Sequence, residues 1–270
     1  MLRRLHQWTG VALAAWLLLV SLTGGLLLWK DDWLRLRHPS LPAATVPEPD
    51  PDVLARIVGD DGAVRVLGLP TAGLPAYHVW LEGGGERLLH PETGVTVAAW
   101  TWIDSVPGFL FELHAHLLAG PTGETVSGGL ALALLVSLAS GFPLWLRRRR
   151  VYRLRHAWPA RLERPHLIRS HAAQGVLAGG FFLLTALTAL VLVFPATAAT
   201  LLHGGLGARG PARPAVTTAP DASGPVDWAA VLAASRTAFP EAVPRFLMPP
   251  DGPGRPVVVR LRNAGELHPN

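Results

Sequence analysis

The sequence contains no cysteine. This absence excludes disulfides, CxxC redox chemistry, cysteine-ligated zinc, iron–sulfur clusters and haem attached through a CxxCH motif. Charge is also scarce, since 16% of the 270 residues are charged and 50% are hydrophobic, with a mean hydropathy of +0.31. That balance argues against a purely cytosolic enzyme. The eleven histidines remain as the only strong ligands for a transition metal.

Familiar catalytic motifs are missing too. The sequence has no GxSxG, no HExxH, no Walker loop and no GxGxxG after a strand, which removes the common hydrolase, metalloprotease and nucleotide-binding signatures. The long apolar stretches contain no acidic residue, and Gln174 is their only strongly polar side chain. Because a pump or ion transporter usually needs an intramembrane carboxylate, neither function is expected.

Three uncharged stretches are long enough to cross a bilayer, which takes about 20 apolar residues. They are Gly10–Trp29, Ser127–Leu146 and Ala172–Phe194. The first follows Arg3 and Arg4, as the apolar region of a signal peptide would. However, its apolar run is too long, and no small-x-small cleavage site follows it. We interpret it as an uncleaved signal anchor.

Basic residues predict the orientation, because they gather on the cytoplasmic side of a membrane. Residues 147–171 carry nine arginines against one acid, and residues 1–9 carry two arginines and no acid. Segment 30–126 has six basic and thirteen acidic residues, and segment 195–270 has seven and five. The N-terminus is therefore predicted in the cytoplasm and both large segments, including the C-terminus, outside. Much of the +5 net charge reflects this topology, so no nucleic-acid partner is expected.

Both outer segments are predicted to hold a helix followed by strands. In the first, a Pro-rich linker precedes a short helix, Val53–Val58, and strands are expected over 63–69, 76–82, 87–90 and 95–100. Gly83–Gly85 and Pro91–Gly94 are the predicted turns. In the second, a helix over Trp228–Ala238 precedes strands over 245–248 and 256–262.

The two outer segments also resemble each other. A shift of 180 residues superposes Arg65, Leu67, Pro70, Val79 and Leu81 on Arg245, Leu247, Pro250, Val259 and Leu261. These matches and the shared order of elements indicate an internal repeat. The second copy lacks the final strand of the first, which predicts one complete and one incomplete lobe.

Five histidines fall at predicted membrane edges: His6 and His171 on the cytoplasmic side, and His114, His116 and His203 on the outer side. Two tiers are what a pair of b-type haems needs, because each iron takes two neutral imidazoles from different helices. The many glycines of these helices would leave room for a flat macrocycle. The alternative is that these histidines are interfacial residues and the glycines serve packing alone.

The other histidines and the acids of the first outer segment are expected at the surface. These histidines are His38, His78, His90, His156, His166 and His268, and the acids are Asp60, Asp61, Glu82, Glu86 and Glu92. The simplest interpretation of the acids is a solvated face, and a weak metal-capturing patch is the alternative.

Several motifs resemble those of one family, the PepSY-associated transmembrane family. The first helix of that family is similar to Leu5–Gly10 with Ser21–Gly24, and a turn of its PepSY domain is similar to Pro91–Gly94. Its second helix is similar to Glu112–His114 with Gly120, Gly123 and Ser140-Gly141. Its third helix is similar to Arg169–His171 with Gly175. The resemblance covers nearly the whole chain. It implies a membrane α-helical protein with three transmembrane helices and small extracytoplasmic α+β PepSY-like lobes.

On this basis the chain divides into six parts. They are 1–29 (cytoplasmic N-terminus and first helix), 30–105 (PepSY-like lobe), 106–146 (interfacial segment and second helix), 147–171 (Arg-rich cytoplasmic loop), 172–194 (third helix) and 195–270 (second, incomplete lobe). The family usually has a fourth membrane helix after the second lobe, and this sequence ends at Asn270 before one. A ligand from that helix would have to come from elsewhere, for example from an oligomer.

The family includes iron-regulated inner-membrane proteins and ferric-siderophore reductases that contain haem. The resemblance therefore implies an inner-membrane electron-transfer protein with one or two haem b groups, which takes electrons from a donor that the sequence does not identify and reduces ferric chelates outside. It implies His6, His114 and His171 as ligands of haem iron, with His116 and His203 as further candidates. Outer-sphere electron transfer needs no catalytic acid or base. The alternatives are a non-catalytic, membrane-anchored binding or regulatory protein, and a permease for the intact chelate, which three helices without a polar pathway disfavour.

Overall fold

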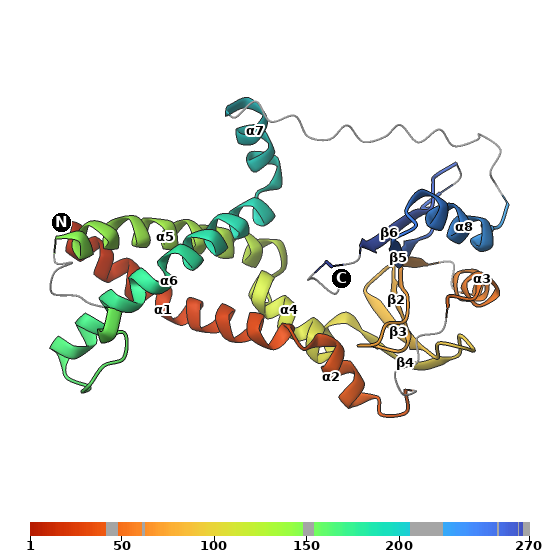
Figure 1. The fold of residues 1–270 in the computed structure, drawn as a ribbon, viewed down its shortest axis with the longest axis horizontal. Coiled ribbons are helices and arrows are strands. Elements are labelled where there is room, and N and C mark those ends of the chain that lie inside the picture. The colour runs from red at the N-terminus through yellow and green to blue at the C-terminus, as the bar shows by residue number, and fades with distance from the viewer. Residues whose placement is uncertain are drawn as a thin grey trace. The chain divides into compact units, whose positions relative to one another are not determined.

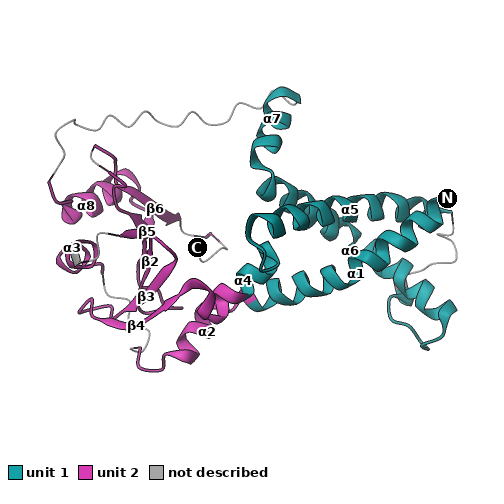
Figure 2. Cartoon of the chain, turned by 180° about the vertical axis from the view of Figure 1, so that it is seen from behind, with its two compact units in different colours: residues 1–26, 110–212 teal, residues 27–109, 213–270 magenta. Residues whose placement is uncertain are grey.

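A computed structural model describes residues 1–41, 48–60, 63–147, 154–205, 224–252, 254–263 and 265–266. The chain forms two compact units, shown in different colours in Figure 2. The helical unit contains residues 1–26 and 110–212, and the sheet unit contains residues 27–109 and 213–270. Each unit is thus built from two separate stretches of the chain.

Three long helices dominate the helical unit: α1 (Leu2–Leu27), α5 (Gly120–Leu146) and α6 (Arg164–Val193) (Figure 1). Each is long and apolar enough to cross a membrane, which confirms the three predicted spans. All three begin before the predicted apolar stretches. Proline in the first turn of α5 and of α6 suits a helix start, because it leaves no N–H without a partner there.

The three long helices meet at a small apolar core. Leu13 of α1, Leu134 of α5 and Ala186 of α6 are almost completely buried and form one cluster. Away from this core the helices stay apolar, and Leu18, Phe181 and Leu192 are each more than 60% exposed. Helices that are apolar on all sides match a lipid environment. The helical unit is therefore a multi-pass membrane unit.

Several shorter helices were not expected from the sequence. They are α2 (Lys30–Arg37), α4 (Val106–His116) and α7 (Pro195–Gly205), together with two short 3₁₀ turns, Trp102–Asp104 and Leu154–His156. A tight turn joins α4 to α5, in which Leu117 and Leu118 adopt positive φ angles of 50° and 58°. The turn requires Gly123, because a Cβ there would lie 1.6 Å from the carbonyl oxygen of His116.

The sheet unit holds one antiparallel sheet of six strands in the order β4-β3-β2-β1-β5-β6. The strands are β1 (Val64–Gly68), β2 (Tyr77–Leu81), β3 (Gly85–Leu89), β4 (Thr96–Thr101), β5 (Ala242–Met248) and β6 (Val258–Asn263). Helices α3 (Pro51–Asp60) and α8 (Trp228–Ala238) flank them. The sequence suggested two separate lobes, whereas the strands join in one sheet. The physical reason is that two strands and a helix bury too little apolar surface to be stable alone. Pairing of β5 with β1 extends the first set of strands and joins both sets in one sheet.

The strand register supports the internal repeat. Leu67 and Leu247, which are equivalent in the 180-residue shift, pair directly across the β1–β5 junction. Leu67 also pairs with Val79, and Leu247 pairs with the equivalent Val259. The two copies are thus related by an approximate two-fold axis at the β1–β5 junction. Leu67 and Leu247 are fully buried in the main core, beside Leu54 of α3 and Leu232 of α8.

Candidate functional site

The structure brings two of the predicted ligands together. His6 lies in the second turn of α1, and His171 lies in the third turn of α6. Their ring centres are 5.9 Å apart, with an angle of 51° between the ring planes. Two imidazoles that bind opposite sides of one metal ion, at about 2 Å per bond, have ring centres roughly 6 Å apart. The two rings are therefore close enough to reach one metal ion between them.

The His6 ring is held by the facing helix α5. Its Nδ1 lies 3.0 Å from the carbonyl oxygen of Ser137 and 3.4 Å from the hydroxyl of Ser140. The ring also lies directly against Gly141, because a Cβ at that position would be 2.8 Å from the Cε1 of His6. A metal-binding histidine typically donates its other ring N–H to a carbonyl or carboxylate. The contact with Ser137 fulfils this condition.

His114 repeats this arrangement at the other end of α1. Its Nδ1 lies 3.1 Å from the hydroxyl of Thr23, and a Cβ at Gly24 would be 2.9 Å from its Cε1. Seventeen residues separate His6 from Thr23 along α1, which is roughly 26 Å at a rise of 1.5 Å per residue. His6 and His114 therefore lie at opposite ends of α1.

The remaining two candidates are placed differently. His116 follows His114 by two positions on α4, so the two rings point to different sides of the helix. His116 donates from Nδ1 to Glu112, at 2.7 Å, and stands edge-on to Phe111. His203 lies on α7 with an exposed side chain. The structure includes neither of them in the His6–His171 pair or the His114 contact with α1.

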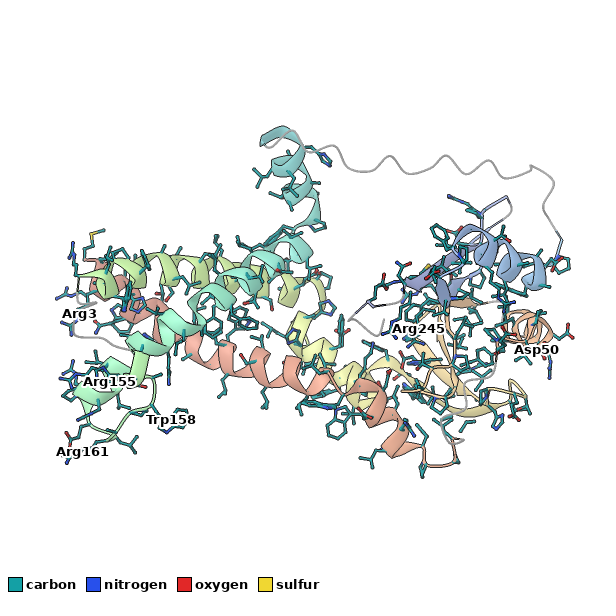
Figure 3. The ribbon with its side chains drawn as sticks, viewed as in Figure 1. Arg3, Asp50, Arg155, Trp158, Arg161 and Arg245 are labelled. Carbon is teal, nitrogen blue, oxygen red and sulfur yellow. The ribbon has the colours of Figure 1, made fainter. Side chains whose placement is uncertain are left out.

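The basic residues cluster at the end of the helical unit that carries His6 and His171. Arg3, Arg155 and Arg161 lie together at this end in Figure 3. Two hydrogen bonds hold Ala157, which precedes α6, near His171. Ser170 and Gln174 both donate to the carbonyl of Ala157, at 2.7 and 2.9 Å. Gln174, the one strongly polar side chain of the predicted spans, therefore has a structural partner.

These residues fit a haem group better than a bare metal ion. Within the part of the chain that the structure describes, no three His, Cys, Asp or Glu side chains converge as a metal-ion site would require. Haem iron needs only two protein ligands, and His6 and His171 have that spacing. The His6 ring occupies the space that a Cβ at Gly141 would fill, which holds the ring against α5. At the other tier His114 supplies one imidazole.

A second polar site lies on the sheet unit, and two predictions about it were wrong. His78 and Glu86 were expected at the surface, yet their exposed fractions are 9% and 2%. Glu86 accepts a 2.7 Å hydrogen bond from the Nε1 of Trp100 and lies 3.4 Å from His78. Because strand side chains alternate, both residues lie on the sheet face opposite the main core, where Trp80 and Trp100 cover His78.

Cations gather on the same sheet face. The Arg245 and Arg260 guanidinium groups lie 5.0 and 5.7 Å from the centre of the Phe246 ring, within cation–π range. Arg245 is buried and donates to the carbonyl of Leu69, and Figure 3 shows it on the sheet. Burial lowers the pKa of Lys30. The charge of Asp31 raises this pKa, and the charges of Arg245 and Arg260 lower it. This cationic face consists of Lys30, Arg245, Phe246 and Arg260.

A small cavity of about 150 Å³ lies beside this face, between α2 and the β4–α4 segment. Trp33, His38 and Trp100 are among its lining residues. His38 is half-buried and stacks on Trp100 with ring centres 5.4 Å apart, so it is less exposed than expected. Sites for drug-sized ligands are roughly 300–1,000 Å³. The cavity is smaller than that range.

Comparison with known proteins places the whole chain in one family. The model of the PepSY-associated TM region matches residues 3–263. A comparison with curated proteins gives no match. The matched range includes His6, His114 and His171, both glycine contacts and all six strands of the sheet. The chain is therefore a member of the PepSY-associated transmembrane family.

Proposed function

We propose that this chain is a haem b-containing electron-transfer protein of the bacterial inner membrane, which reduces ferric chelates on the extracytoplasmic side. The observation that carries this proposal is the approach of His6 and His171, from two different membrane helices, to 5.9 Å between ring centres. When bound, haem b supplies a centre that accepts and releases single electrons.

The residues around the pair explain what the protein contributes. His6 is held by the Ser137 carbonyl at 3.0 Å, which fixes its orientation before a ligand arrives. Gly141 carries no side chain, which lets the His6 ring pack directly against α5. The surrounding helices are apolar, so charge at this position is costly and the redox potential depends strongly on ligation. Electron transfer makes and breaks no bond to the protein, so no acid–base residue is required.

The charge distribution supports the proposed direction of electron flow. Arg3, Arg155 and Arg161 at the His6–His171 end support a cytoplasmic location for that end, by the positive-inside rule. Electrons would enter at this end from a separate donor. His114 lies about one bilayer thickness away along α1, and it provides the tier nearer the outside. Its second ligand would be His203 or a group from another chain.

The cationic face of the sheet unit supports an anionic substrate. Lys30, Arg245 and Arg260 combine positive charge with the ring of Phe246. Ferric iron bound by carboxylate, catecholate or similar oxygen ligands usually carries negative charge, which such a face attracts. Arg260 is the exposed cation of this face, so it is the residue that a bound anion would meet first.

The second candidate function is a non-catalytic binding or regulatory protein, in which the membrane helices only anchor the sheet unit. One observation favours it: the cationic face could bind an anionic partner without any cofactor. The two functions differ in their need for histidine. An anchor tolerates the loss of His171, whereas a haem protein does not.

The decisive experiment is a visible spectrum of the detergent-purified protein, oxidised and then reduced with dithionite, with haem quantified as the pyridine haemochrome. We expect a reduced b-type α-band, a loss of at least half of the haem in His171→Ala, and reoxidation of the reduced protein by ferric citrate. The matched control is His166→Ala, which removes a histidine from the first turn of the same helix.

The outcomes separate the two functions. Equal haem content in His166→Ala and wild type, together with loss in His171→Ala, supports the haem protein. Folded wild-type protein that contains no haem, after expression with added haem precursor, rejects it and favours the binding protein. Haem that is retained in full by both variants rejects the assignment of His171.

A further inference from the structure

Two histidines of the helical unit rest on the same dipeptide pattern of a facing helix. His114 lies over Gly24, and the hydroxyl of the preceding Thr23 contacts its Nδ1 at 3.1 Å. His6 lies over Gly141, and the hydroxyl of the preceding Ser140 lies 3.4 Å from its Nδ1. The two contacts lie at opposite ends of α1, and helices α1 and α5 each provide one hydroxyl–glycine pair.

The hydrogen bonds of Thr23 decide where His114 carries its proton. A threonine hydroxyl has one proton to donate. Thr23 donates that proton to the carbonyl of Leu19, one turn earlier on α1, at 2.8 Å. While Thr23 donates to Leu19, its oxygen accepts from His114, and this arrangement places the hydrogen on the Nδ1 of His114. In a neutral imidazole the Nε2 is then left with a free lone pair.

The same conclusion holds for His6 by a different acceptor. A backbone carbonyl only accepts, so the 3.0 Å contact with Ser137 places the hydrogen on the Nδ1 of His6. Ser140 donates its own proton to that carbonyl, at 3.0 Å, and is only a weaker second acceptor for His6. The Nε2 of His6 is therefore also left with its lone pair.

We infer that Thr23 is the positioning residue that holds His114 as the Nδ1–H tautomer over Gly24, and that the Ser137 carbonyl does the same for His6 over Gly141. Neutral histidine in water prefers the opposite tautomer, so these contacts reverse an intrinsic preference. Both rings then present an Nε2 lone pair, which is the form that a metal ligand needs. This inference rests on the proposed function only in naming haem iron as the partner of that lone pair.

The two positions differ in what they lose when the hydroxyl is removed. Ser140→Ala leaves the stronger Ser137 contact in place, so His6 should keep its tautomer. Thr23→Val removes the 3.1 Å hydrogen bond of His114 to the hydroxyl and leaves the ring its interaction with the Val20 carbonyl, so part of the Nδ1–H population is retained. Thr23→Ser keeps the hydroxyl. The chain thus offers a test variant, a conservative rescue and a matched control at the equivalent position.

The tautomer can be read without haem. We would label the histidines with ¹⁵N, record spectra of the haem-free protein in lipid, and assign His6 and His114 by single His→Asn variants. Wild type should show Nδ1–H at both positions. Thr23→Val should convert part of His114 to the Nε2–H form, because the Val20 carbonyl stays beside the ring, whereas Thr23→Ser and Ser140→Ala should not. An Nε2–H signal for His114 in wild type, or no change in Thr23→Val, would overturn the inference.

Haem binding provides the second measurement. Loss of an outer hydrogen bond to a ligating histidine typically lowers metal affinity by about 10–100-fold. We expect such a loss at one haem site in Thr23→Val, with a higher midpoint potential because the imidazole donates less electron density. Thr23→Ser should restore both values. Wild-type protein with the Nδ1–H tautomer but no haem would reject the proposed function alone, whereas haem-loaded protein insensitive to Thr23→Val would reject this inference alone.

Discussion

Gly141→Ala tests whether the close contact between α1 and α5 positions His6. A Cβ at residue 141 would lie 2.8 Å from the Cε1 and 3.2 Å from the Nδ1 of His6. To reach an ordinary contact of 3.4 Å, the ring or the helix must move by about 0.6 Å. A shift of this size, directed away from α5, lengthens the 3.0 Å bond to Ser137 beyond hydrogen-bonding range.

The magnitude follows from two opposing effects. Overpacking of this kind costs about 1–3 kcal/mol, and exchange of glycine for alanine within a helix favours folding by up to about 1 kcal/mol. Gly129→Ala is the matched control, because residue 129 lies on the same helix and nothing stands within 4 Å of a Cβ there. The helix preference is common to both variants, so their difference isolates the overlap, and we expect Gly141→Ala to be less stable by about 1–3 kcal/mol.

The assay compares thermal unfolding of both variants in the same detergent and titrates haem into each. We expect Gly129→Ala to bind haem as wild type does, and Gly141→Ala to lose about 10–100-fold in affinity, as for other losses of a ligand's outer support. Equal stability and equal haem affinity in the two variants would refute the argument that α5 positions His6.

Three further predictions concern the sheet unit. Glu86→Leu removes the acceptor of the Trp100 indole in a buried position and should lower the free energy of unfolding by about 1–3 kcal/mol. Chemical unfolding of the detergent-solubilised protein measures this loss, and an unchanged midpoint would contradict the role of this bond. Burial, followed by the charge of Arg37, lowers the pKa of His38 below 6.5. The unfolded state therefore binds more protons just below pH 6.5, stability should fall as the pH drops through this window, and His38→Gln should flatten that slope. Arg260→Gln should weaken the binding of ferric citrate, measured by calorimetry, most strongly at low salt. The control Arg255→Gln changes an exposed residue paired with Asp251 and should leave binding unchanged. Equal losses of affinity in the two variants would contradict a role of the cationic face in binding.

Periodicity and charge made most of the secondary structure predictable. The three membrane helices follow from apolar runs without charge, and helix α8 begins and ends where the sequence predicts, with Asp227 accepting from the N–H of Ala230 as its cap. The strands follow from alternation and from the Gly83–Gly85 turn. The short helices α2, α4 and α7 escaped prediction because each directly precedes or follows a long membrane helix, whose apolar run obscures a separate period.

Burial on the second sheet face could not be predicted from the sequence. His78 and Glu86 occupy the alternate positions of β2 and β3, which is the pattern of a solvent-facing side. Only the approach of α2, with Leu34 packed on Leu88, and the aromatic cover of His78 bury that face. A polar residue at an alternating position is exposed only if no other element covers it, and the covering element here is distant in sequence.

The sequence by itself determined the membrane class, the number of spans, the internal repeat and which histidines lie near the ends of membrane helices, because hydropathy, charge and spacing act locally along the chain. The tertiary structure alone decided that the two repeats share one sheet, that His6 meets His171, and that Thr23 and Ser137 face the Nδ1 atoms of His114 and His6. These contacts join residues between 91 and 165 positions apart, or strands from both halves of the chain. Their formation depends on helix rotation and close approach at glycines, which no local pattern of residues encodes.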